Sequence, residues 1–255
     1  MSDTDSHYLG GYEVTHAGDW VLLGGSDREE PPPPPMAPTF WDGLTESARD
    51  WFLANGQERR VADGHQLLRQ GARPTKVVLL LDGATISDTI TERGERGYVD
   101  LARSGDLLGA AEAISGDFHP ATVRTITAHN RVLSVPLTFL HRALRAQPDI
   151  TIAFVHALTA QLARTDQLRA ALIGPAHPRI AYILLYLAER IGTMSPAGLV
   201  ITMARADIAA WTGLSIRTVE HVLSNLQCAS CITCARRKIT ITDAGFILAM
   251  ASAER

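Results

Sequence analysis

The chain has 255 residues, 46% of them hydrophobic and 20% charged, and its formal net charge is −3. This length suits one large domain or two ordinary ones, and a charge so near zero excludes a uniformly basic nucleic-acid coat while leaving room for a local basic face. The sequence has no apolar run of 18 residues, which argues against a membrane span, and no signal peptide at Met1–Gly10, which argues against export. Its three cysteines, an odd number, argue against a disulfide framework. Together these features predict a cytoplasmic protein.

The first segment, residues 1–38, is acidic and rich in proline. It carries seven acidic residues against one basic residue, a net charge of −6, and its end contains the five consecutive prolines Pro31–Pro35. Consecutive prolines favour the polyproline II helix and supply no amide donors. We therefore predict a mostly disordered head with a stiff spacer at its end.

Residues 39–148 are predicted to form an all-β domain behind one short helix. The helix is expected over residues 40–56, where five apolar residues recur at helical spacing and Gly56 follows: Trp41, Leu44, Ala48, Trp51 and Phe52. From residue 59 to residue 136, short apolar runs alternate with glycine turns. Strands of four to six residues with regular turn signals are typical of a barrel or sandwich.

A long helix is predicted next, in the segment 149–173. Pro148 suits the first turn of a helix, and Gly174-Pro175 ends it. Residues recur along it at alternating steps of three and four: Val155, Leu158, Leu162, Thr165, Arg169 and Leu172. This spacing is typical of a two-stranded coiled coil, so we predict a dimerisation helix, with an ordinary core helix as the alternative.

Residues 174–255 carry a net charge of +3 and contain the most informative pattern. A short helix at 205–211 is followed by the turn Thr212-Gly213-Leu214 and by Ser215, which is suited to cap a second helix. This arrangement is a helix-turn-helix, whose second helix enters the major groove of DNA. Opposite its apolar face, that helix carries Ile216, Arg217, Glu220 and His221.

A basic cluster follows the second helix. Arg236, Arg237 and Lys238 stand directly before the alternating Ile239-Thr240-Ile241, a pattern that predicts a β-hairpin with positive charges at its tip. Beside a helix-turn-helix, such a hairpin is a wing that contacts the DNA backbone, and its contacts weaken as salt rises. A solvated basic turn is the alternative.

The three cysteines, Cys228, Cys231 and Cys234, form a C-x2-C-x2-C pattern. Zinc and iron–sulfur clusters are held at such spacings by four ligands, and His221 is the obvious fourth candidate. A free cysteine is as often a small buried hydrophobic residue. A metal or redox role and a purely structural role both stay open at this point.

The order of these segments resembles the CRP/FNR family of bacterial transcription regulators, over about residues 40–250. Ser104–Gly109 resembles the G-D-x-x-G turn of that family, Leu158–Arg164 its dimer helix, and Met203–Ser215 its helix-turn-helix, nearest to the FNR/FixK-like branch. The resemblance implies an α+β fold. In it, a cyclic-nucleotide-binding-like β-roll (39–148) is joined by the dimerisation helix (149–173) to a winged helix-turn-helix (174–255).

The resemblance also implies DNA contacts. Arg205 and Thr218 match phosphate contacts, and Ile216, Arg217 and His221 occupy base-reading positions. The family commonly has an arginine where this chain has His221, and an imidazole cannot donate the two hydrogen bonds that a guanidinium gives to guanine, so Arg217 becomes the best candidate for a guanine contact. The expected partners are a second copy of the chain, double-stranded pseudo-palindromic DNA and, as a further candidate, RNA polymerase. The predicted DNA-binding set is Arg205, Ser215, Ile216, Arg217, Thr218, Glu220, His221, Arg236, Arg237 and Lys238.

Cyclic AMP is not the effector that these residues favour. Relatives that bind it have a glutamate after the turn glycine, and an arginine with a small hydroxyl residue before an alanine, whereas here Ala110 follows Gly109 and His119-Pro120 precede Ala121. The permanent charge and the fork that suit a phosphate are missing. The sequence identifies no certain cofactor, and the effector stays unknown. Candidate pocket residues are Gly109, Ala110, Glu112, His119, Ala121, Thr122, Arg124 and Arg169.

The leading hypothesis is a homodimeric, sequence-specific DNA-binding regulator that an effector controls. One alternative is a ligand- or partner-binding module whose winged helix contacts protein, and another is a regulator that responds to redox state or metal through the cysteines. FNR-type sensors carry their cluster cysteines in the N-terminal half, where this chain has none. An enzyme is disfavoured because no nucleophile–base arrangement, phosphate loop or HExxH motif is present.

Overall fold

The computed structural model describes residues 38–90, 94 and 96–252, together with the backbone of three short paired strands, β1 (Tyr8–Leu9), β2 (Tyr12–Val14) and β3 (Trp20–Leu22). The head predicted to be disordered, residues 1–38, lies outside the described residues except for these strands and Pro38. The chain divides into two compact units, residues 36–166 and residues 167–255 with 1–35, and each is described by itself.

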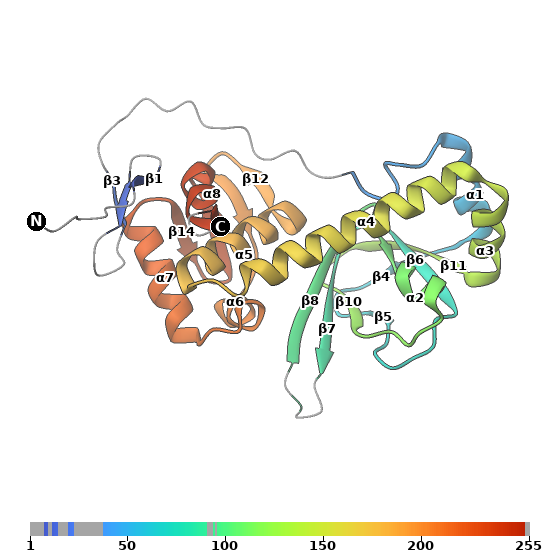
Figure 1. Cartoon of the computed structure of the whole chain (residues 1–255), viewed down its shortest axis with the longest axis horizontal. Coiled ribbons are helices and arrows are strands. Elements are labelled where there is room, and N and C mark those ends of the chain that lie inside the picture. Colours follow the sequence, from blue (N-terminus) through green and yellow to red (C-terminus); the bar gives the residue numbers. More distant parts are fainter. Residues whose placement is uncertain are drawn as a thin grey trace, which may run out of the picture. The chain divides into compact units, whose positions relative to one another are not determined.

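The first unit is built around two four-stranded antiparallel sheets (Figure 1). The strand order of one sheet is β5 (Gln66–Leu68), β10 (Thr122–Thr125), β7 (Ala84–Ile90), β8 (Arg96–Arg103). The order of the other is β4 (Gln57–Val61), β11 (Asn130–Pro136), β6 (Lys76–Asp82), β9 (Leu107–Leu108). The predicted strands between residues 59 and 136 are confirmed, but the region is not all-β, because the short helix Ala110–Ser115 interrupts it.

Strand β6 explains how this unit is packed. Its residues Val77–Leu80 are fully buried, and successive side chains of a strand point to opposite faces. Val77 and Leu79 belong to a core cluster with the helices, whereas Val78 and Leu80 belong to a cluster between the sheets. A strand buried on both faces needs a continuous apolar run, and KVVLLLD supplies it.

Four helices belong to or begin in this unit: α1 (Glu46–Asn55), α2 (Ala110–Ser115), α3 (Leu137–Ala146) and α4 (Pro148–Ala171). Helix α1 is shorter than the predicted 40–56, because Thr45 caps it through the backbone N–H of Ala48, and residues 40–44 form turns. Phe40 lies edge-on to Phe52 and Phe154, with ring centroids 5.3 and 6.5 Å away, and this contact packs the start of the domain against α4.

Residues 167–255 hold the end of α4 and a small α/β domain. Its helices are α5 (Ala176–Ile191), α6 (Arg205–Thr212), α7 (Ile216–Cys228) and α8 (Ala244–Ser252). Its four-stranded sheet has the order β12 (Thr193–Ser195), β13 (Gly198–Ile201), β15 (Lys238–Ile241), β14 (Ile232–Ala235). In the part of the chain that the structure describes, no helix is both long and apolar enough to span a bilayer.

Candidate DNA-binding surface and effector cavity

The helix-turn-helix is formed by α6 and α7 and is set by two local features. Gly213 ends α6 with φ of 66°, a left-handed conformation that favours glycine. The Ser215 hydroxyl then accepts a hydrogen bond from the Thr218 backbone N–H at 3.1 Å and caps α7. Both features were predicted from the sequence and are confirmed.

Helix α7 separates into a buried and an exposed face. Val219, Val222, Leu223 and Leu226 are buried, as predicted. The predicted DNA-facing residues Ile216, Arg217, Glu220 and His221 are all exposed, and Thr218 is half-buried. The amphipathic pattern alone therefore identified the surface of α7 that remains accessible.

The charged residues of this surface differ in their partners. Arg205 Nη1 lies 3.4 Å from Glu220 Oε1, and both side chains are largely exposed, so this ion pair contributes little stability. The Arg217 side chain makes no hydrogen bond or ion pair with another of the described residues. His221 lies edge-on to His177 of α5, with ring centroids 6.5 Å apart. Arg217 is thus the exposed guanidinium on α7 that is free to contact a ligand.

Arg179 is a structural residue of this domain that the sequence did not single out. Its Nε and Nη2 donate to the Gly174 carbonyl at 3.1 and 2.7 Å, and its Nη1 donates to the Thr212 carbonyl at 3.1 Å. One side chain therefore ties the segment before α5 to the end of α6. An arginine near the start of a mostly apolar helix was the available signal, but its targets are backbone carbonyls that no side-chain pattern reveals.

The predicted wing is the hairpin of β14 and β15. Its turn holds Arg236 and Arg237, the latter at φ of 55°, and Lys238 begins β15. All three basic side chains are exposed, and none of them forms an ion pair with another of the described residues. The hairpin therefore presents an uncompensated positive tip.

The three cysteines lie in different environments. Cys231 is buried between α7 and β14, and burial raises the pKa of its thiol to about 12. Burial also raises the pKa of Cys234, although the nearby Arg205 guanidinium acts in the opposite direction. Cys228 is exposed. Among the described residues, no group of three His, Cys, Asp or Glu side chains is arranged to hold a metal ion.

These environments predict an order of thiol alkylation. With iodoacetamide at about pH 8, Cys228 should be modified first and Cys231 only after unfolding, because the thiolate is the reactive form. Since the folded state favours the protonated Cys231, its contribution to stability is complete below the ordinary pKa of 9.0 and is lost as the pH rises towards 12. Mass spectrometry of native and urea-unfolded samples measures the order, and rapid labelling of native Cys231 would contradict it.

The first unit contains a cavity of about 120 Å³ beside the G-D-x-x-G turn. Gly109 caps α2 with φ of 76°, and a Cβ there would lie 3.3 Å from the His119 ring. Five of the eight predicted pocket residues line the cavity, namely Gly109, Ala110, Glu112, His119 and Ala121. The other three, Thr122, Arg124 and Arg169, are not among its lining residues.

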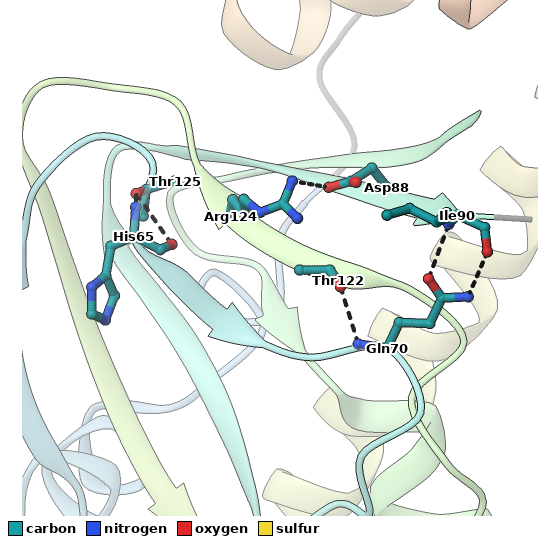
Figure 2. A network of polar contacts seen from close by, with 7 residues as sticks. All are labelled: His65, Gln70, Asp88, Ile90, Thr122, Arg124 and Thr125. Carbon is teal, nitrogen blue, oxygen red and sulfur yellow. Dashed lines mark hydrogen bonds and ion pairs between the residues drawn. The ribbon is translucent and has the colours of Figure 1, made fainter. Parts of the chain in front are cut away.

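Thr122 and Arg124 are engaged in the sheet instead, as Figure 2 shows. Arg124 Nη1 lies 2.8 Å from Oδ1 of the buried Asp88, and the Thr122 hydroxyl accepts the Gln70 backbone N–H at 3.1 Å. The Gln70 side chain in turn pairs with the backbone of Ile90 at 3.0 and 3.3 Å. These contacts join β5, β7 and β10, so both residues hold the sheet together.

Helix α4 contributes two cavity residues that the sequence analysis missed, Gln161 and Arg164. They share one helix face with Ala157, which also lines the cavity, at spacings of three and four residues that could have revealed them. Gln161 Nε2 lies 3.5 Å from Asp100 Oδ2. Arg164 Nε is buried and has no hydrogen-bond partner among the described residues.

Helix α2 and the segment before β10 supply a second polar pair to the cavity. The Nδ1 atom of the buried His119 lies 3.5 Å from Glu112 Oε2, and Glu112 is also mostly buried. The cavity therefore combines an acidic group beside an imidazole with a guanidinium.

Two family models match this chain. The cyclic nucleotide-binding domain matches residues 58–147, and the Crp-like helix-turn-helix domain matches residues 178–246. The fumarate and nitrate reduction regulatory protein of Vibrio cholerae is 24% identical over 203 residues, 78% of this chain and 80% of that protein.

Solved structures share the fold. TTHB099, a CRP-family transcriptional regulator of Thermus thermophilus, is 22% identical with a TM-score of 0.65, over 76% of this chain and 96% of its own. The regulator CLP of Xanthomonas campestris, described as c-di-GMP responsive, is 20% identical with a TM-score of 0.67, over 77% and 99%. With the β-roll, the long helix and the winged helix-turn-helix in this order, the chain belongs to the CRP/FNR family of DNA-binding transcription regulators.

Proposed function

We propose that this regulator works in the cytoplasm as a homodimer that recognises a pseudo-palindromic DNA site, under the control of a small effector in the β-roll cavity. The exposed face of α7, with Arg217 free beside the Ser215 cap, is the observation that carries the proposal. RNA polymerase is the further partner that a regulator of this kind would contact.

The DNA contacts divide into two kinds. Arg205, Thr218 and the wing residues Arg236, Arg237 and Lys238 would contact phosphates and fix the register. Ile216, Arg217, Glu220 and His221 would face the base edges from α7, with Ser215 at its start. Of these, Arg217 can donate two hydrogen bonds to guanine, which makes it the main determinant of sequence.

The dimer would form along α4. Ile152, Val155 and Leu162 are 55%, 49% and 60% exposed, although they are large apolar residues on one helix. Their spacing of three and seven residues is that of a coiled-coil seam. Leu158, which the sequence analysis included in the seam, packs partly against the core of its own domain, so the seam is proposed to pass through Ile152, Val155 and Leu162.

Replacing Leu162 by glutamate should therefore separate the dimer. A charge at the centre of an apolar seam is costly, and a monomer binds only one half-site, so affinity should fall by at least about 100-fold. Sedimentation equilibrium and fluorescence anisotropy measure the two effects. Leu53→Glu, at an exposed leucine of α1, is the matched control and should remain a dimer. A dimeric Leu162→Glu protein would contradict this seam.

Selection from random duplex DNA, with ligand-free protein at about 150 mM salt, tests the proposal as a whole. A two-fold symmetric site is the expected result, with half-sites about 34 Å apart between centres. Affinity for it should fall steeply with salt, since phosphate contacts release counterions. A winged helix that contacts protein instead would enrich no sequence and show no such dependence on salt.

A further inference from the structure

The cavity of the β-roll contains a positive group that needs an acceptor. Arg164 comes from α4, lines the cavity, and has a buried Nε without a hydrogen-bond partner among the described residues. This Nε–H loses its hydration without gaining a protein acceptor among the described residues, which is costly unless a ligand compensates it. A carboxylate matches the planar donors of a guanidinium best.

A negative group from another part of the chain lines the same cavity. Glu112 of α2 contacts His119 at 3.5 Å, a separation that leaves most of the acceptor capacity of its carboxylate unused. An acceptor that is only weakly engaged favours a ligand with N–H donors.

The size of the cavity limits the ligand further. A cavity of about 150 Å³ is filled by benzene, and pockets for drug-sized ligands run to roughly 300–1,000 Å³. At about 120 Å³, this cavity suits a molecule of roughly six non-hydrogen atoms, as the benzene comparison indicates. A cyclic nucleotide is far larger, and its phosphate would meet His119 beside Glu112 where the binding relatives offer an arginine.

We propose that the cavity binds a small zwitterion of the α-amino acid class, with its carboxylate on Arg164 and its ammonium group towards Glu112. This inference rests on the proposed effector control, because it names the ligand of the same cavity. Charges of both signs from different elements favour a ligand that carries both, and they disfavour simple anions and simple amines.

Isothermal titration of the full-length protein with L-alanine tests the proposal, with propionate and ethylamine as probes that each lack one charged group. Alanine should saturate the protein, whereas each single-charge probe should bind at least about tenfold more weakly. Arg164→Met and Glu112→Gln should each weaken alanine binding by at least about tenfold. The matched controls Arg145→Met and Glu46→Gln change exposed residues outside the cavity and should leave it unchanged.

Two outcomes would overturn the inference. One is the absence of saturable binding by alanine, glycine or serine up to about 10 mM, which corresponds to a free energy too small for an effector. The other is alanine binding that Arg164→Met does not weaken although the variant melts at the wild-type temperature. DNA-site selection with the same preparation keeps the two ideas apart, since a symmetric site with no zwitterion binding rejects the ligand class alone.

Discussion

Alanine in place of Arg217 is expected to abolish most of the preference for the selected DNA site. A bidentate contact to guanine is worth about 1–3 kcal/mol, so the two half-sites together lose about 2–6 kcal/mol, or roughly 30-fold to more than 10,000-fold in affinity. Arg217 is exposed and has no hydrogen-bond or ion-pair partner among the described residues, so its removal should cost the free protein little stability. Fluorescence anisotropy with the selected duplex and a scrambled duplex measures the loss.

Arg236→Ala is the matched control for this prediction. This substitution also removes a guanidinium from the DNA-binding domain, but at the turn of the wing, where we propose a phosphate contact. It should weaken binding to both duplexes alike and reduce the slope of log affinity against log salt by about two, one for each half-site. If Arg217→Ala also weakened both duplexes equally, Arg217 would be a phosphate contact and the assignment of guanine recognition would be wrong.

Loss of Asp88 is expected to have the largest effect on stability. Asp88 is 1% exposed and lies 2.8 Å from Arg124, which is 28% exposed. Removing one partner of a buried pair costs about 3–5 kcal/mol, and the partial exposure of Arg124 lowers our expectation for Asp88→Ala to about 2–4 kcal/mol. Because the pair joins β7 to β10, the amides of these strands should lose protection against hydrogen exchange.

A surface pair in the other sheet provides the comparison. Glu58 and Arg131 are 2.9 Å apart but 40% and 46% exposed, so Glu58→Ala should cost less than about 1 kcal/mol. Urea unfolding of the two variants, followed by hydrogen exchange of the first unit, measures both losses. Equal losses would mean that burial does not decide the contribution of the Asp88 pair.

The helix-turn-helix could be predicted from the sequence because its determinants are local. Gly213 ends one helix, Ser215 caps the next, and the apolar spacing of α7 selects its buried face within 13 residues. The same holds for the strands of the first unit, whose apolar runs are separated by glycine turns. In each case the residues that decide the structure lie within one or two turns of one another.

The cavity could not be predicted in the same way. Glu112, His119 and Arg164 come from three segments, and their common cavity depends on how α2 and α4 pack on the sheets. Arg124 was expected to face a ligand, but it forms an ion pair with Asp88 instead. The two residues lie close together because β10 pairs with β7 in the sheet. Helix α1 begins later than predicted since Thr45, rather than the apolar pattern, sets its start.

The three hydrogen bonds of Arg179 have a consequence for transplanting this domain. The residue binds the carbonyls of Gly174 and Thr212, so the turn before α7 is braced from a point some thirty residues earlier in the chain. A lysine at position 179 would keep the charge but could not reproduce the fork of donors. The shortest segment that could be transferred to another protein with α6, α7 and the Arg179 hydrogen bonds therefore begins at Gly174. The helix-turn-helix itself begins only at Arg205.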